Sequence, residues 1–205
     1  PRLGLLAAPH DMESALTISA HDIEKVLNMV QNQHEVVLVD LPRTLNVLSL
    51  KALDMADVIF IVTQCNTPDV RDAQRLVSTL RALGYKDNKL RLLVNQHTSG
   101  AWVSLPELEK AVGLNVTHTL PSLPQWVNEA LHTGKPLASV HDHNGVMHVL
   151  REMAGALLDK VLTKDMAQAI RDTPDFRVIV MGRKQVTTDL PEYCWLQTIF
   201  SIGAD

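Results

Sequence analysis

Residues 34–42 limit the fold of this chain more than any other stretch of its sequence. They read His-Glu-Val-Val-Leu-Val-Asp-Leu-Pro, so that an apolar run meets a single carboxylate, Asp40, before a proline. A run without polar alternation is typical of a strand covered on both faces, as in the parallel sheets of α/β proteins. We therefore predict an interior parallel strand that ends near Asp40 and is stopped by Pro42.

Asp40 is the first candidate functional residue, because open α/β sheets bind ligands at the carboxyl ends of their strands. In phosphate-binding proteins an aspartate in that place commonly holds Mg²⁺, directly or through water. An aspartate that only caps the following turn is the alternative. The residue pattern leaves both interpretations open.

Strands and helices alternate along most of the chain. Ser19 and Asp22 have the spacing of a capping box, which opens a helix expected to bury Ile23, Val26, Leu27 and Val30. Further apolar strands are predicted at residues 3–7, 58–63, 90–94 and 115–120, and a long amphipathic helix at 144–162. Right-handed crossovers then give an α/β fold with a doubly wound, mainly parallel sheet and helices on both faces.

Composition sets the outer limits of the function. The 205 residues are 46% hydrophobic and 20% charged, with a net charge of −4, which suits one α/β domain and gives no sign of nucleic-acid binding. Cys65 and Cys194 match no zinc or redox spacing, as expected in a reducing cytoplasm. No signal peptide or apolar run long enough to span a membrane is present, so we expect a cytoplasmic protein without a transmembrane segment.

The order of these segments resembles the MinD/ParA deviant-Walker ATPases, and most closely their pilus-assembly branch, the CpaE/TadZ proteins. The general resemblance rests on residues 34–42, 57–63, 71–76 and 92–95. The phrases Ala8-Pro9, Asp40-Leu41-Pro42-Arg43 and Gly134-Lys135-Pro136-Leu137 are similar to that branch. The resemblance covers residues 3–160 and implies a P-loop NTPase fold, here truncated.

The resemblance also implies a function and site residues. In that family ATP is held between two subunits, and the protein acts as a homodimer on pilus and secretion proteins at the cell pole or inner membrane. Asp40 then positions Mg²⁺ and the attacking water, Asn95 contacts adenine, and Pro121, with Ser122, walls the base. An asparagine that satisfies loop backbone groups and an ordinary turn proline are the alternatives.

The phosphate loop of the family is the main departure. No G-x-x-x-x-G-K-[ST] occurs in the 205 residues, and we expect that loop in a segment upstream of Pro1. Met181-Gly182-Arg183-Lys184 lacks its glycine spacing and the hydroxyl after lysine. Because loop amides and the lysine supply most of the phosphate affinity, we expect the chain as given to bind ATP weakly or not at all.

Loss of the phosphate-loop strand would also leave a gap in the sheet. In the family that strand lies between the strands that end here at Asp40 and Thr63. Unpaired backbone groups on both sides of a buried gap would each cost about 1–3 kcal/mol. We predict that a tail strand at residues 176–181 fills the gap, within one chain or by exchange between chains.

Several other groups are weaker candidates. His141, His143 and His148 lie within eight residues, but without the pattern of a structural zinc site they indicate a solvated loop. His10, Glu13 and Ser14 lack a nucleophile elbow. Cys65 is predicted to pack, since no histidine neighbours it in sequence, and Trp126 is predicted to join the core or else to anchor a partner.

Three functions remain: a MinD/ParA-type ATPase, a non-catalytic localisation scaffold on the same fold, and an unrelated α/β nucleotide-binding enzyme. The absence of G-x-G-x-x-G after any strand weighs against the third. Sequence upstream of Pro1 would separate the first two. We divide the chain into residues 1–162, the C-terminal part of an ATPase domain, and a tail, 163–205, for which only the strand at 176–181 is predicted.

Overall fold

The computed structural model describes residues 5–6, 12–34, 36–141, 145–168 and 177–181. Its five strands form one sheet in the order β1-β5-β2-β3-β4, and all of the paired strands are parallel. The strands are β1 (Val37–Leu41), β2 (Val58–Thr63), β3 (Leu90–His97), β4 (Val116–Pro121) and β5 (Arg177–Met181). The predicted α/β class with a parallel sheet is therefore confirmed.

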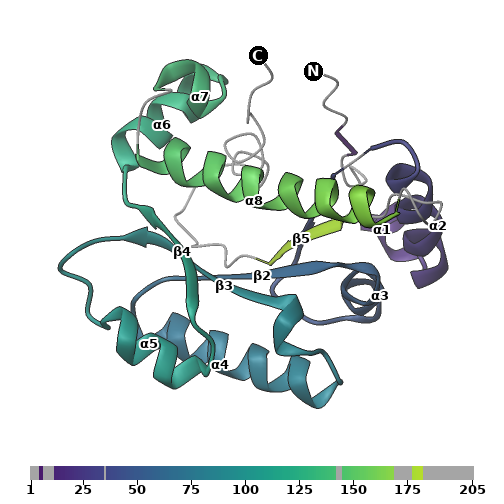
Figure 1. Cartoon of the computed structure of the whole chain (residues 1–205), viewed down its shortest axis with the longest axis horizontal. Helices are drawn as coiled ribbons and strands as arrows, with labels where there is room; N and C mark the ends of the chain where they lie inside the picture. The colour runs from purple at the N-terminus through teal and green to yellow at the C-terminus, as the bar shows by residue number, and fades with distance from the viewer. Residues whose placement is uncertain (1–4, 7–11, 35, 142–144, 169–176, 182–205) are drawn as a thin grey trace.

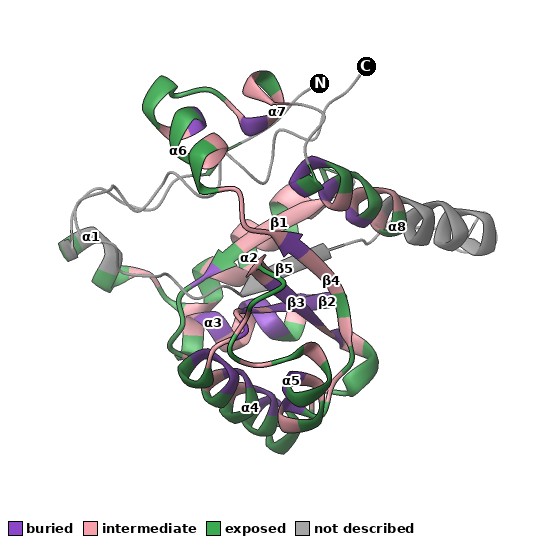
Figure 2. Ribbon diagram, turned by 90° about the vertical axis from the view of Figure 1, so that its left-hand side faces the viewer, coloured by how far each residue is buried: buried purple, intermediate pink, exposed green. Residues whose placement is uncertain are grey.

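Helices cover both faces of the sheet (Figures 1 and 2). The helices are α1 (Met12–Thr17), α2 (Ala20–Gln31), α3 (Val47–Met55), α4 (Thr67–Ala82), α5 (Leu105–Val112), α6 (Pro124–Thr133), α7 (Leu137–Val140) and α8 (Gly145–Gln168), with a 3-10 turn, η1 (Asp87–Lys89). From β1 to β4 the chain crosses the sheet in one direction, through α3, α4 and α5. It returns from β4 to β5 through α8 on the other face, as right-handed crossovers require when the direction reverses.

Two apolar cores lie on the two faces of the sheet. Alternate side chains of β2 point to opposite sides, so that Ile61 packs with α3, α4 and α5, whereas Phe60 packs with α8. Leu53 of α3 and Met147 of α8 are almost fully buried in the respective cores. The two cores pack the sheet between two layers of helices.

Strand β5 fills the central gap that the sequence analysis predicted. Val39 of β1 and Ile59 of β2 are both register partners of Ile179. The strand begins at Arg177, whereas Phe176 lies outside the described residues. Pairing on both edges gives the backbone groups of β1 and β2 the partners that an empty gap would deny them.

The position of β1 differs from the prediction. Within the described residues β1 pairs only with β5 and lies at the edge of the sheet, so the expectation of an interior strand is wrong. Its residues Val37, Leu38 and Val39 are half-buried. The apolar run indicates that helices cover both faces of the strand. Covered faces do not determine whether a further strand pairs with its free edge.

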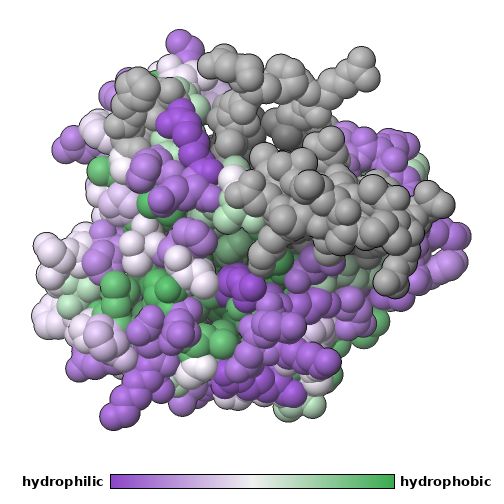
Figure 3. Space-filling view, in the orientation of Figure 1, coloured by the Kyte–Doolittle hydropathy of each residue, from purple (hydrophilic) through white to green (hydrophobic). Residues whose placement is uncertain are grey.

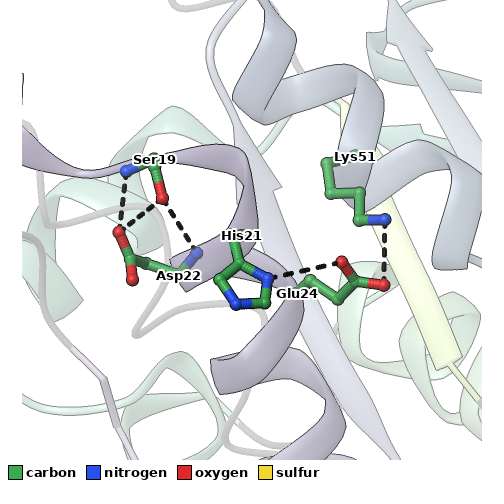
Figure 4. Close-up of polar contacts among 5 residues, drawn as sticks. All are labelled: Ser19, His21, Asp22, Glu24 and Lys51. Atoms are coloured by element: carbon green, nitrogen blue, oxygen red, sulfur yellow. Dashed lines mark hydrogen bonds and ion pairs between the residues drawn. The ribbon is translucent and has the colours of Figure 1, made fainter.

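The capping box of α2 is confirmed (Figure 4). The Ser19 hydroxyl accepts from the Asp22 amide at 3.2 Å, and the Asp22 carboxylate accepts from the Ser19 amide at 3.0 Å. Lys51 of α3 pairs with Glu24 of α2 at 2.9 Å, which ties the two helices together. The predicted full burial of α2 is wrong, because its four apolar residues are only half-buried, with Ile23 and Leu27 packed against the core on the α3 side.

Other boundaries differ in detail. α8 ends at Gln168 rather than near residue 162. Asn66 caps α4, and its side-chain oxygen accepts from the Asp69 amide at 3.0 Å. Leu5 and Leu6, the described part of the predicted first strand, are not in a strand. Residues 193–202 lie outside the described residues.

Large apolar side chains also reach the surface. Trp102, between β3 and α5, is 93% exposed, and Figure 3 shows hydrophobic side chains among hydrophilic ones over one face of the molecule. Scattered exposure of this kind does not by itself mark an interface. No described helix is long and apolar enough to cross a membrane.

Candidate functional site at the carboxyl edge of the sheet

The carboxyl ends of all five strands meet at one edge of the sheet, which we call the carboxyl edge. Because the pairings are parallel, Asp40, Thr63 and Asn95 follow three buried or half-buried strand segments to this same edge. Asp40 is level with Arg91 in the register across β5 and β2. Asn95 therefore lies about 14 Å from it across the sheet and about 13 Å along the strands, which puts the two residues roughly 19 Å apart. The predicted arrangement on one edge is confirmed.

Asp40 is the next-to-last residue of β1 and is the register partner of Val180. Strand alternation puts it on the same face as Leu38, which packs in the core under α8. Its side chain remains open to solvent. Even so, the desolvation that the surrounding protein imposes raises the pKa of Asp40 above the usual aspartate value.

A bound cation would stabilise the charged form of Asp40 in that environment. A raised pKa means that the fold disfavours the charged form of Asp40, and a nearby positive ion would reverse that preference. Carboxylate oxygens at an open edge are the ligands that Mg²⁺ prefers, with water completing its shell. Asp40 therefore fits a magnesium ligand, although its role there remains a prediction.

Asn95 is half-buried near the end of β3. Its Oδ1 accepts from the Gln96 amide at 2.9 Å, and Gln96 has a left-handed φ of 53°. The side-chain oxygen therefore satisfies a backbone amide at the irregular end of β3, close to the alternative interpretation, which gave it a loop backbone group. Among the described residues Nδ2 has no hydrogen-bond acceptor, so that the amide nitrogen is able to donate to a ligand such as a purine.

Pro121 and Ser122 lie beside the end of β3. Pro121 is the register partner of His97, and the Ser122 amide donates to the His97 carbonyl at 3.1 Å. A Cβ on Gly145, at the start of α8, would approach Pro121 Cγ to 3.1 Å. The ring of Pro121, the last residue of β4, therefore lies close to the start of α8 and beside the end of β3, the strand that carries Asn95, while its role as a wall for the base stays a prediction.

A pair of glutamines also lies on this edge, and the sequence analysis did not identify it. Gln64 directly follows β2, and its Nε2 lies 3.5 Å from Oε1 of Gln96. This contact bridges the ends of β2 and β3, between Asp40 and Pro121. Polar residues immediately after apolar strands were the signal that could have found them.

The other candidates do not assemble into sites. No group of three possible metal ligands occurs among the described residues. His141 stacks on Trp126 with a centroid distance of 4.7 Å and pairs with Glu129 at 2.9 Å, while the exposed His148 lies 3.9 Å from Glu152. His143, His10 and residues 182–184 lie outside the described part.

Cys65 and Trp126 take packing positions. The Cys65 thiol is buried, and desolvation raises its pKa, which disfavours the reactive thiolate. Trp126 is half-buried and packs against the core under α8. Both predictions of packing are confirmed.

Known proteins resemble this chain in sequence and in fold. A family profile described as an AAA domain matches residues 3–92. The septum site-determining protein MinD of Thermotoga maritima is 20% identical over 126 residues, 59% of this chain and 46% of that protein. The solved ParA family ATPase from Chlorobium tepidum TLS has a TM-score of 0.66 at 16% identity, covering 69% of this chain and 59% of that one. The MinC:MinD cell division protein complex of Aquifex aeolicus gives 0.56 at 20% identity, covering 67% and 60%.

The chain thus spans less than two thirds of each of these relatives. At identities below 25% the solved structures establish the fold, an α/β sheet of parallel strands with helices as in MinD and ParA. Taken with the matching sequence segments, they support a MinD/ParA-like family for this chain.

Proposed function

We propose that the chain is part of an ATP-binding, ATPase-type protein of Flp/Tad-like pilus assembly. It would act as a homodimer that forms on nucleotide and positions secretion machinery, in the cytoplasm or peripheral to the inner membrane. The MinD/ParA-like comparisons support the nucleotide-dependent part of this proposal. The pilus role rests on the three short phrases similar to the CpaE/TadZ branch, of which the one from Asp40 to Arg43 lies beside the candidate site.

In this proposal the two ends of the carboxyl edge bind different parts of the nucleotide. At the β1 end, Asp40 would orient Mg²⁺ and the water that attacks the terminal phosphate. At the β3–β4 end, Asn95 Nδ2 would donate to the base while Pro121 and Ser122 form its wall. Magnesium, when bound, supplies charge neutralisation for the phosphate oxygens.

One observation carries the proposal: a carboxylate that the fold disfavours in its charged form shares an edge with a donor amide and a fixed proline. Structural carboxylates usually have lowered pKa values, as Asp22 does in its capping box. Asp40 has the opposite shift. A carboxylate kept in an unfavourable environment at the carboxyl edge of a parallel sheet is a candidate for function.

Amide-resolved NMR tests the site even if binding is weak. Titration of the ¹⁵N-labelled chain with ATP and Mg²⁺ should shift amides at Asn95 and Ser122, with a dissociation constant in the millimolar range, about 4 kcal/mol. Asn95→Ala should weaken binding about tenfold, a loss of about 1.4 kcal/mol for one hydrogen bond. The matched control Asn88→Ala changes an exposed asparagine in η1, before the start of β3, and should bind like the parent chain. Shifts that map away from the carboxyl edge would contradict the proposal.

A non-catalytic localisation scaffold is the second candidate. The observation that favours it is the lack of a glycine-rich loop with lysine in these 205 residues, because such a loop provides most of the phosphate affinity. The scaffold would use the same fold and the same partners without hydrolysis. Adenosine and ATP would then bind equally weakly, and Mg²⁺ would make no difference to either.

A further inference from the structure

Two glutamine side chains meet across the carboxyl ends of β2 and β3, and neither has a role in the function proposed above. We call Gln64 and Gln96 the glutamine pair. Thr63 of β2 and Val94 of β3 are register partners, so Gln64 lies beside Asn95, the residue before Gln96. Gln64 Nε2 is 3.5 Å from Gln96 Oε1, and both residues are half-buried. The pair therefore lies next to the amide that is proposed to contact the base.

A bulge in β3 sets the direction of the Gln96 side chain. β3 has two residues, and β4 only one, between the register pairs Val94–Thr119 and His97–Pro121. Within this bulge Gln96 has a φ of 53°, the one positive φ of a non-glycine residue in the described part of the chain. Bulges and left-handed residues of this kind are frequent at functional sites, where they turn a side chain toward a ligand.

The glutamine pair presents one hydrogen-bond acceptor and one donor to a ligand. The contact between the two amides uses one N–H and one carbonyl oxygen, which leaves Gln64 Oε1 and Gln96 Nε2. Neither of these atoms has a hydrogen bond to another described residue. A neutral acceptor beside a neutral donor matches two adjacent hydroxyl groups, because each hydroxyl can both donate and accept. A phosphate group is instead bound by cationic side chains or by several backbone amides.

The order of the strands indicates which hydroxyl groups reach the pair. Across the sheet, Gln64 at the end of β2 lies between Asp40 of β1 and Asn95 of β3. The sugar of a nucleotide lies between its base and its phosphates. With the base at Asn95 and the metal-bound phosphates at Asp40, the ribose lies over the end of β2.

We propose that the glutamine pair binds the two ribose hydroxyls of the nucleotide. One hydroxyl donates to Gln64 Oε1 and the other accepts from Gln96 Nε2, so that the site selects ribonucleotides over 2′-deoxyribonucleotides. A deoxy sugar leaves one half-buried amide group without its partner, and sites that bind a substrate hydroxyl discriminate on that basis. This inference rests on the proposed nucleotide site and names the sugar that the site selects.

Titration of the ¹⁵N-labelled chain with ATP and with 2′-deoxy-ATP, each with Mg²⁺, tests the proposal. The backbone amides of Asn95 and Ser122 report nucleotide binding, and the side-chain NH2 signals of the glutamine pair report contact with the sugar. We expect 2′-deoxy-ATP to bind about fivefold more weakly than ATP, the usual effect of one neutral hydrogen bond. Equal affinities, with shifts at Asn95 and Ser122, would overturn the inference and leave the proposed function standing. Absence of shifts at both amides with either nucleotide would overturn both.

Two variants remove the pair in different ways. Gln64→Ala changes no residue of the bulge in β3, and Gln96→Gly removes the side chain at a φ that glycine adopts without strain. In each variant the ratio of the two dissociation constants should fall from about five to about one, a change that reduced stability alone does not produce. The matched control Gln74→Ala changes an exposed glutamine of α4 and should keep the parent ratio. An unchanged ratio in either folded pair variant, or a lost preference in the control, would contradict the proposal.

Discussion

The central position of β5 makes a substitution in its backbone costly. Ile179 is the register partner of both Val39 and Ile59, and Ile179→Pro removes its N–H from the ladder. Losing one hydrogen bond costs about 0.5–1.5 kcal/mol, and a buried carbonyl left without its donor costs about 1–3 kcal/mol. The expected loss is about 2–4 kcal/mol, out of a typical total of about 5–15 kcal/mol.

Urea unfolding followed by circular dichroism measures this loss. With a slope of about 2 kcal/mol per molar urea, the midpoint should fall by about 1–2 M. Ile179→Val is the control, since it keeps the N–H in the ladder and the β-branched shape, and it should lower the free energy of unfolding by less than the proline variant does. If proline and valine variants unfold within about 0.5 kcal/mol of each other, β5 is not a central strand.

Three further outcomes follow from burial and charge. Leu53→Ala should lower the free energy of unfolding by about 2–5 kcal/mol, because Leu53 is fully buried, whereas Val47→Ala on the exposed side of α3 should change it by less than about 0.5 kcal/mol. Burial lowers the pKa of His118 in the fold, so that the unfolded chain binds more protons and the free energy of unfolding falls as the pH drops below about 6.5. His118→Gln should flatten that fall between pH 7.5 and 5.5. An unchanged slope in the variant would contradict this assignment to His118. Desolvation raises the pKa of Asp40 in the fold, so the charged carboxylate destabilises the folded chain, and this loss develops as the pH rises from the pKa of the unfolded state through the pKa of the folded state. Asp40→Asn should therefore melt no lower than the parent at pH 7. A clear drop in the melting temperature of the variant would contradict this reasoning.

The sequence predicts most of the sheet because its strands are unbroken apolar runs. Two such runs, at residues 58–63 and from residue 90 onward, can be assigned as strands without tertiary information. Few other structures bury an unbroken apolar run of that length on both faces. The position of β5 between β1 and β2 was predicted because an empty gap would leave unpaired strand edges. The pairing of Ile179 with both Val39 and Ile59 confirms that position. The edge position of β1 did not follow, because face coverage and lateral pairing are independent properties of a strand.

The candidate site shows the same limit. Asp40 and Asn95 were predicted on one edge, because carboxyl ends of parallel strands share it, and they lie there. A backbone hydrogen bond to the Asn95 side chain was one of two alternatives in the sequence analysis, and the sequence could not choose between them, because the Gln96 amide reaches Asn95 Oδ1 where Gln96 has a left-handed φ. The desolvation of Asp40 likewise depends on neighbours that are distant in sequence.

Manganese tests most directly the central claim that the carboxyl edge holds a metal–nucleotide complex. With ATP present, Mn²⁺ in place of Mg²⁺ should broaden the amide signals nearest Asp40, and Asp40→Asn should abolish the effect. Asp57→Asn, at the opposite end of β2, should leave it unchanged. Broadening centred on Asp57, or an equal response in both variants, would contradict the account.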